Sequence, residues 1–403
     1  MFRLARGFRS LLVVPALFAA AALPGCGNDG GGGDSGGGGD VGTVRIAVCG
    51  PMTGSAAAFG EMIKNAAKLK EKEINDAGGI TVDGVKMKVE AVIFDDKGDT
   101  TEATNVARKV ASDDSLSLVV GHFNSTCSLA AKEEYNRVGI VQFSPGSTNV
   151  KVCQGGPYTF RNLYRDDYQG DQIAVYLKST LGLEKAAVLF DNDDYGKGLM
   201  QSFKARAEKE GLEVVATVSY LRERTQDFKP LVQQAKDAGA GAIFVAGLYN
   251  EAALIAKSAR QDHQMDVPII GGDGVMSPTF IKNAGKAAEG ALVTTPFLFN
   301  TGDDSEMAKS FLAAFKGAYG KEPDTWAALT YDAMGMALDA VSKAGLDRTA
   351  IKDQLASAVD EATGYTGVTG VTYFNEDGDC ESKPVYVAVV KDGEFVPAEK
   401  QMK

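Results

Sequence analysis

The sequence predicts an α/β protein with two mostly parallel sheets, and three observations carry that prediction. From Val44 onward, short β-branched runs alternate with longer stretches whose apolar residues recur at helical spacing. Such alternation is typical of parallel sheets covered by helices on both faces. The elements also fall into two series on either side of the irregular segment 144–166, and 403 residues suffice for two domains.

The first series runs from 44 to 144. We expect it to contain strands at 44–50, 85–96, 116–121 and 139–144, and helices at 61–76, 101–112 and 125–138. The first helix should end at the glycine pair Gly78-Gly79, which is a C-terminal helix signal.

The second series begins after residue 166. Strands are expected at 186–191, 213–220, 242–247, 268–272 and 291–297, with helical stretches such as 231–239 and 251–261 between them. A long helix at 325–345 and a β-rich tail through 372–378 and 384–390 should complete the fold.

The N-terminus predicts export and lipid attachment. Three arginines precede an apolar run that is too short and wrongly flanked to span a membrane. The string LPGC, Leu23 to Cys26, resembles a bacterial lipoprotein cleavage box, which implies removal of residues 1–25 and lipidation of Cys26. An ordinary signal peptide is the alternative. Residues 26–42 are rich in glycine and have no apolar side chain between Cys26 and Val41, so we expect a flexible tether.

Charge and composition exclude several functions. Removing residues 1–25, which hold three arginines and no acids, changes the formal charge from −11 to −14. Nucleic acid is therefore not an expected partner, because phosphate binding needs clustered cations. There is no CxxC motif, and the two histidines lie far apart, so we expect no metal site. No nicotinamide fingerprint stands at the first strand–helix turn, and we expect no cofactor.

Polar and glycine-rich segments follow the predicted strands. In open parallel sheets, ligands bind just beyond the carboxyl ends of the strands. The segments at these positions are PMTGSAAAFG, GHFNST, SPGSTN, DNDDYG, GLYNE and GGDGV.

Seven motifs in order resemble the branched-chain amino-acid binding proteins that feed ABC importers. They are GPMTGSAAAFG, NDAGGI, FDDKGD, GHFNST, SPGSTN, DYGKG, and GGDG followed by AAEGALVTTP. The resemblance covers nearly all of the chain after the tether. It implies a type I periplasmic binding fold with two lobes, each a mostly parallel sheet flanked by helices, and three hinge crossings near Asp166, Thr295 and Pro384. The implied lobes are 43–165 with 296–383, and 166–295 with 384–403.

The resemblance also implies roles for single residues. The ligand carboxylate would be held by Ser125, Gly146 and Thr148, and the ligand ammonium by Asp273. The pocket and its lid would be formed by Phe59, Phe123, Asn124, Tyr195, Leu248 and Tyr249.

Some positions depart from the family pattern. Many relatives have Glu at the position of Asp273, so the carboxylate here is one methylene shorter. A pocket Tyr of the family corresponds to Phe59, and a cysteine pair of some relatives corresponds to Gly98 and Asn124.

The chemistry of the residues is consistent with these roles. Ser125 stands where a helix begins, so backbone N–H groups and the positive end of the helix dipole would face a carboxylate. Capping by Ser125 or Asn124 is the structural alternative. Gly146 permits close approach of the backbone, although SPGSTN could also be a plain turn. Asp273 could be a turn cap, or it could pair with an ammonium, since a buried charge without a partner is costly.

Two cysteines and one tryptophan are expected to have structural roles. Cys127 and Cys153 follow the two carboxylate loops and are a candidate disulfide, with two reduced thiols as the alternative. Trp326 does not share a helix face with Tyr331 and is expected to be structural.

These observations predict a binding protein rather than an enzyme. His122 is three residues from Ser125, but the sequence offers it no recognisable orienting acid. We expect a monomeric, exported protein, lipid-anchored to a membrane facing the periplasm or cell exterior. It would capture Leu, Ile or Val and deliver it to an ABC permease. The alternatives are a short amide, urea-like or aromatic-acid ligand, or a ligand-sensing receptor domain.

Overall fold

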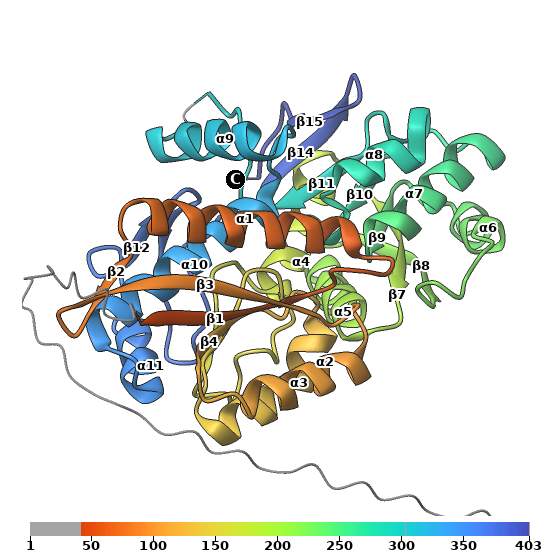
Figure 1. Cartoon of the computed structure of the whole chain (residues 1–403). Coiled ribbons are helices and arrows are strands. Elements are labelled where there is room, and N and C mark those ends of the chain that lie inside the picture. Colours follow the sequence, from red (N-terminus) through yellow and green to blue (C-terminus); the bar gives the residue numbers. More distant parts are fainter. Residues whose placement is uncertain (1–41, 303, 403) are drawn as a thin grey trace, which may run out of the picture. The chain divides into compact units, whose positions relative to one another are not determined.

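The computed structural model describes residues 42–302 and 304–402 (Figure 1). The predicted signal peptide, the lipidation site Cys26 and nearly all of the tether lie outside the described residues. Among the helices of the described part, none combines the length and apolar character needed to cross a membrane.

The first lobe is built on a six-stranded sheet. Its strand order is β2-β3-β1-β4-β5-β6, and all neighbours are parallel except β2 and β3. The strands are β1 (Thr43–Gly50), β2 (Ile80–Val82), β3 (Val85–Asp95), β4 (Leu116–Val120), β5 (Gln142–Ser144) and β6 (Thr159–Arg161). Because β1 pairs in register with β3 from Thr43↔Lys88 to Gly50↔Asp95, the carboxyl ends of both strands lie side by side.

Helices cover both faces of this sheet, as Figure 1 shows for α1 on one side and α2 and α3 on the other. Alternate side chains of β1 point to opposite faces of the sheet, and both faces are apolar. Ile46 and Val48 pack in the core cluster that contains Phe59 of α1, whereas Ala47 and Cys49 pack in a second cluster with α2 and α3. The helices of this lobe are α1 (Ala57–Asp76), α2 (Thr100–Ala111), α3 (Ser125–Val138), α9 (Glu306–Tyr319), α10 (Thr325–Ala344) and α11 (Arg348–Ala356).

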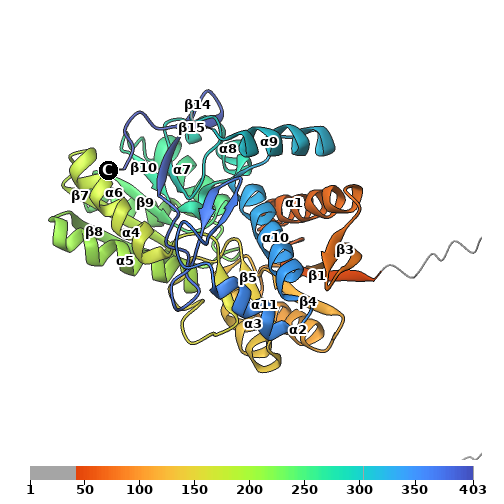
Figure 2. The ribbon, with the colours of Figure 1, turned by 90° about the vertical axis from the view of Figure 1, so that its left-hand side faces the viewer.

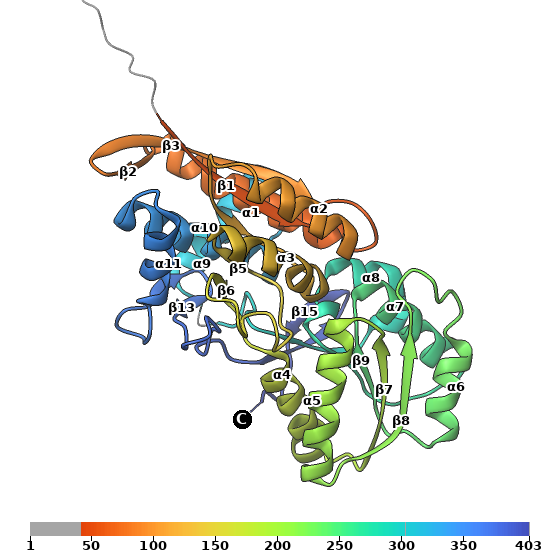
Figure 3. The same cartoon turned by 90° about the horizontal axis from the view of Figure 1, so that it is seen from below.

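The second lobe is built on a seven-stranded sheet. Its order is β15-β14-β11-β10-β9-β7-β8, parallel from β11 to β8 and antiparallel at β14 and β15. The strands are β7 (Lys185–Asp191), β8 (Glu213–Tyr220), β9 (Ile243–Ala246), β10 (Ile269–Gly271), β11 (Leu292–Thr295), β14 (Tyr386–Lys391) and β15 (Glu394–Pro397). The α-helices of this lobe are α4 (Asp166–Val175), α5 (Asp194–Glu210), α6 (Lys229–Asp237), α7 (Tyr249–Lys257) and α8 (Pro278–Ala284). Figure 3 shows α5 and α6 on opposite sides of β7 and β8.

Short helical turns and one hairpin complete the described fold. Single π-type turns extend α4 and α7 at Tyr176–Thr180 and Ser258–Asp262. Two 3₁₀ turns lie at Asp273–Val275 and Gly285–Ala288. The hairpin pairs β12 (Tyr365–Gly367) with β13 (Gly370–Thr372).

The chain passes between the two sheets three times. It leaves the first sheet after β6, returns after β11 to form α9 to α11, and leaves again before β14. Figure 2 shows α10 next to α1 on the first lobe, although α10 follows all five parallel strands of the second sheet. The predicted α/β fold with two mostly parallel, helix-covered sheets is confirmed.

Candidate ligand-binding site

Segments that follow five strands of the two sheets meet around one small cavity. Its volume is about 20 Å³, which is room for about one water molecule. The lining residues are Phe123, Asn124 and Ser125 after β4, Gly146 after β5, Tyr195 after β7, Leu248 after β9, Asp273 and Gly274 after β10, and Trp326 of α10. Seven of these nine were predicted as site residues from the sequence.

The two lobes are in direct contact around this cavity. The Tyr249 hydroxyl and the Asn250 amide both donate to the carbonyl oxygen of Ser55, at 2.7 and 2.8 Å. On the other side, the amide of Asn149 donates to the carbonyl oxygen of Asp194 at 2.6 Å. A ligand the size of an amino acid therefore enters only when the lobes separate.

Ser125 begins α3 directly at the cavity wall. The preceding residue, Asn124, has extended N-cap geometry, but its side chain makes no capping hydrogen bond, so simple capping does not explain this position. The hydroxyl oxygen of Ser125 accepts a hydrogen bond from the backbone N–H of Asn149 at 3.2 Å. The helix dipole of α3 and this hydroxyl therefore face the same space, which suits an anion.

The SPGST loop is fastened to the GHFNST loop by serine hydroxyls. Ser144 and Ser147 donate to the carbonyl oxygen of His122 at 2.6 and 3.3 Å, and Ser147 also lies 2.9 Å from the carbonyl oxygen of Phe123. The Ser144 hydroxyl accepts from the backbone N–H of Ser147 at 2.9 Å. The two predicted carboxylate loops therefore move as one unit.

Gly146 and Thr148 occupy special positions in this loop. A Cβ added to Gly146 would stand 2.2 Å from the Phe123 ring, so only glycine fits here. Thr148 is 1% exposed, and its hydroxyl has no hydrogen-bond partner among the residues the structure describes. A buried hydroxyl of this kind is available for a ligand, but Thr148, unlike Gly146, does not line the cavity in this arrangement of the lobes.

The side chain of His122 points away from the cavity into a buried network. Its Nδ1 lies 2.6 Å from Asp96 and its Nε2 lies 2.9 Å from the Tyr135 hydroxyl. The sequence-based view that His122 lacks an orienting acid was wrong, because Asp96 follows β3 and reaches it in space. Since both ring nitrogens are engaged, the ring cannot act as a base for Ser125.

Asp273 is fixed from the second lobe. It lies in the 3₁₀ turn after β10, is 2% exposed, and accepts a 2.8 Å hydrogen bond at Oδ1 from the Tyr195 hydroxyl. The Tyr195 oxygen in turn accepts from the Gly274 N–H at 3.1 Å. Burial raises the pKa of Asp273 to about 6, and Tyr195 partly opposes that rise. The second oxygen, Oδ2, has no partner in the described part of the chain.

Aromatic rings form one wall of the cavity and the layer behind it. Phe123 and Trp326 line it, with ring centroids 4.9 Å apart. Phe59 packs behind them, 4.7 Å from Phe123 and 4.8 Å from Tyr249. Phe59 and Tyr249 therefore adjoin the cavity without lining it. Trp326 makes the structural contact expected of it, since its indole donates to the carbonyl oxygen of Met276 at 3.0 Å, and it also lines the cavity.

The candidate disulfide is not formed in the structure. Cys49, Cys127, Cys153 and Cys380 are all free, buried thiols. Cys153 directs its sulfur to the carbonyl oxygen of Gly378 at 3.6 Å, while Cys127 packs within α3. Burial raises the pKa of Cys127 and Cys153, so both are held as neutral thiols. Within residues 42–302 and 304–402, no cluster of acidic, histidine and cysteine side chains is arranged to hold a metal ion.

Comparison with known proteins identifies the family. The sequence matches the periplasmic binding protein family over residues 43–394. It is 33% identical over 331 residues to Leu/Ile/Val-binding protein homolog 1 of Brucella suis, covering 82% of this chain and 85% of the relative. The chain belongs to the branched-chain amino-acid binding protein family.

Solved structures of this family superpose closely. The leucine-binding protein LivK of Thermotoga maritima has a TM-score of 0.82 at 32% identity, covering 89% of this chain and 98% of that one. LivJ of Streptococcus pneumoniae in complex with isoleucine has a TM-score of 0.81, with the same identity and coverage. Because the family consists of exported substrate-binding proteins, the prediction of a binding protein rather than an enzyme is confirmed.

Proposed function

We propose that this protein captures free leucine, isoleucine or valine between its lobes and delivers it to an ABC permease. The observation that carries the proposal is the pairing of opposite binding chemistry across one cavity. The first lobe presents an anion site at Ser125 and the SPGST loop, and the second lobe presents the buried carboxylate of Asp273. A zwitterionic amino acid has both complementary groups within a few ångströms.

In this proposal the ligand carboxylate meets the Ser125 hydroxyl, the backbone at Gly146 and the free hydroxyl of Thr148. The ammonium meets Asp273, which Tyr195 holds in place. The side chain meets the aromatic wall of Phe123 and Trp326 together with Leu248 of the second lobe. The names of the relatives support the ligand class, since Brucella suis and Streptococcus pneumoniae proteins are described as binding branched-chain amino acids.

Lobe closure is the step that buries the ligand. The lobes would be 43–165 with 296–383, and 166–295 with 384–403, and would separate by a hinge motion at the three passages. The contacts of Tyr249 and Asn250 with Ser55 would hold the closed form. A permease that recognises the closed surface would then distinguish the loaded protein.

Lipid attachment at Cys26 belongs to the proposal as well. The LPGC string supports it, and the glycine-rich stretch to Gly42 would let a monomeric protein move near the membrane. Mass spectrometry of the protein from bacterial membranes should find a diacylglycerol on Cys26. A Cys26→Ser variant should leave the membrane fraction, and retention of this variant would contradict the anchor.

Thermal unfolding with a ligand panel tests the ligand class. The protein from Gly42 onward is measured alone and with millimolar leucine, isoleucine, valine, their des-amino analogues, short amides and benzoate. A ligand at about 100 times its Kd stabilises the native state by about 2.7 kcal/mol. We expect strong stabilisation by the three amino acids and much weaker stabilisation by 4-methylpentanoate. Stabilisation by an amide or benzoate alone would refute the amino-acid assignment.

A further inference from the structure

Asp166 is a buried carboxylate beside the site. It is the first residue of α4, on the passage from the first to the second sheet, and it is 0% exposed. Its backbone N–H donates to the carbonyl oxygen of Thr148 at 2.8 Å, which ties it to the carboxylate loop. On the opposite side it faces α5, because a Cβ on Gly198 would stand 3.7 Å from its Oδ2. Gly198 lies about one turn after Tyr195 on that helix.

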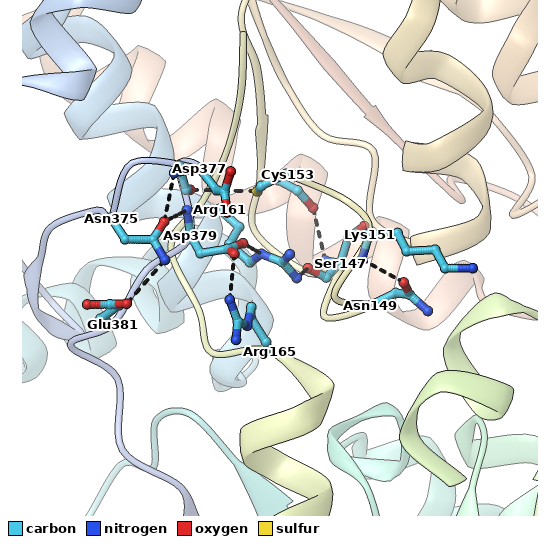
Figure 4. A network of polar contacts seen from close by, with 12 residues as sticks. Ser147, Asn149, Lys151, Cys153, Arg161, Arg165, Asn375, Asp377, Asp379 and Glu381 are labelled. Atoms are coloured by element: carbon cyan, nitrogen blue, oxygen red, sulfur yellow. Dashed lines mark hydrogen bonds and ion pairs between the residues drawn. The ribbon is translucent and has the colours of Figure 1, made fainter. Parts of the chain in front are cut away.

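Neither carboxylate oxygen of Asp166 has a hydrogen-bond partner in residues 42–302 and 304–402. The two arginines near it in sequence both pair with Asp379, as Figure 4 shows, and the Nη2 atom of Arg161 has no hydrogen-bond partner among the described residues. Arg161 pairs with Asp379 at 2.7 Å and donates to the carbonyl oxygen of Ser147 at 2.9 Å. Arg165 pairs with Asp379 at 3.1 Å and with Asp167 at 2.6 Å. No ion pair joins either arginine to Asp166 in the described part of the chain.

A carboxylate in this position needs a cation or a proton. Removing a lone charge from water is costly, and the cost is relieved by pairing or by neutralisation. Burial raises the pKa of Asp166 and the charge of Asp273 raises it further, whereas the neighbouring Thr148 hydroxyl and then Arg161 oppose the rise. Asp166 and Asp273 therefore repel each other across the same small region, and a single positive charge between them would satisfy both.

We propose that Asp166 and Asp273 together hold the ammonium of the ligand, so that two buried carboxylates select the zwitterion. This inference rests on the proposed function and deepens it.

The proposal predicts opposite signs for stability and binding in an Asp166→Asn variant. Removing an unpaired buried charge should raise the unfolding midpoint of the ligand-free protein. The same change should weaken leucine binding on the order of tenfold or more, because the ammonium loses one of its two partners. Binding of 4-methylpentanoate, which has no ammonium, should stay the same or improve. A merely structural Asp166 would lower the midpoint and weaken both ligands equally.

Asp167→Asn is the matched control. Asp167 lies in the same first turn of α4 but is half-exposed and already paired with Arg165. Its replacement should leave the ratio of leucine to 4-methylpentanoate affinity unchanged. If Asp166→Asn also leaves that ratio unchanged while the parent protein binds leucine, Asp166 does not contact the ammonium. If the parent protein binds no amino acid, the proposed function itself fails.

A second measurement uses the unaltered protein, in case the variant does not fold. Calorimetric binding of leucine near pH 6 in buffers of different ionisation enthalpy reports protons released on binding. We expect release, since the ammonium displaces a proton held between the two carboxylates. The charged and titratable groups around Asp166 are Arg161, Asp167, Asp273, Tyr164 and Tyr195. The absence of proton release at every pH between about 5 and about 8 would overturn the proposal.

Discussion

The two halves of the site differ in how well their polar groups are satisfied. On the first lobe, the hydroxyls of Ser144 and Ser147 and the ring of His122 are hydrogen-bonded within the protein, and the site groups without a partner, the Thr148 hydroxyl and Asn124 Oδ1, are neutral. On the second-lobe side, Asp273 keeps one oxygen without a partner and Asp166 keeps two. A satisfied network is rigid, whereas unpaired buried charge destabilises the closed arrangement. The carboxylate side is therefore preformed, and the ammonium side is completed by the ligand.

This difference suggests an order of events. A ligand would first meet the rigid anion site on the first lobe while the lobes are apart. Its ammonium would then neutralise the acidic side, so that closure becomes favourable only with the zwitterion bound. The protein would bind the carboxylate of the ligand while the lobes are open. It would discriminate between ligands with and without an ammonium group when the lobes close.

The largest expected effect comes from removing the charge of Asp273. Truncating one partner of a buried charge pair costs about 2–5 kcal/mol, so leucine affinity should fall on the order of 100-fold in Asp273→Asn. Titration calorimetry with leucine measures the loss. Asp273→Glu, which keeps the negative charge, is the control and should retain binding. Equal leucine affinity of the Asn variant and the parent would contradict the proposed difference between the two halves of the site, since the carboxylate of Asp273 would then contribute nothing to binding.

A pH titration should show a smaller, graded effect. Burial raises the pKa of Asp273 from 3.8 to about 6, so the folded chain holds this proton more tightly than the unfolded chain does. The ligand-free protein should therefore lose stability as the pH rises from about 4 to about 6 and show no further change from this group above that range. Leucine binding needs the ionised carboxylate, so affinity should rise about tenfold per pH unit below pH 6 and then level off.

The measurement is leucine affinity between about pH 4.5 and about pH 7.5. Ser125→Ala is the control, since it lies on the carboxylate side and should lower affinity without changing the pH at which the curve levels off. A flat profile for the parent protein would place the ammonium away from Asp273.

Ser144→Ala tests the preformed side. The Ser144 hydroxyl bridges the carbonyl oxygen of His122 and the N–H of Ser147, and losing such a buried bond costs about 1–3 kcal/mol. We expect leucine affinity to fall about tenfold, while the already weak binding of leucinamide, which lacks the carboxylate, changes little. Ser202→Ala on α5, whose hydroxyl only bonds within its own helix, is the control. Equal losses for both ligands would mean that the serine network supports the fold rather than the anion site.

Much of the fold and most of the site could be predicted from sequence. Helix 125–138 and strand 213–220 have the predicted bounds, because Gly139 ends the helix and Gly211 ends the helix before the strand. The motifs after strands placed Ser125, Gly146 and Asp273 around one cavity, since carboxyl ends of parallel strands share one edge.

Other residues could not be predicted because their roles depend on contacts between distant segments. Trp326 reaches the cavity from a helix that follows both series of strands, and no local pattern indicates this. Asp96 reaches His122 across an intervening strand. The orphan state of Asp166 appears only once Arg161 and Arg165 are seen to pair elsewhere. In each case the sequence shows the residue but does not show which distant residue lies next to it in the folded protein.

The smallest expected effect concerns the closing contact itself. In Tyr249→Phe, the second lobe loses the 2.7 Å hydrogen bond donated to Ser55 and the weaker 3.3 Å bond accepted from the Ala58 N–H. It keeps the ring packed against Phe59 and the neighbouring bond from Asn250. A typical net hydrogen bond contributes about 1 kcal/mol, so leucine affinity should fall about fivefold, mainly through faster release. Stopped-flow release of leucine measures this, with Tyr168→Phe, an exposed tyrosine of α4, as the control. Because Tyr249 holds the lobes and not the ligand, the loss should be equal for leucine and 4-methylpentanoate. A loss of affinity for leucine alone would instead mean that Tyr249 contributes to binding the ligand ammonium, which would extend that part of the site from Asp273 to Tyr249.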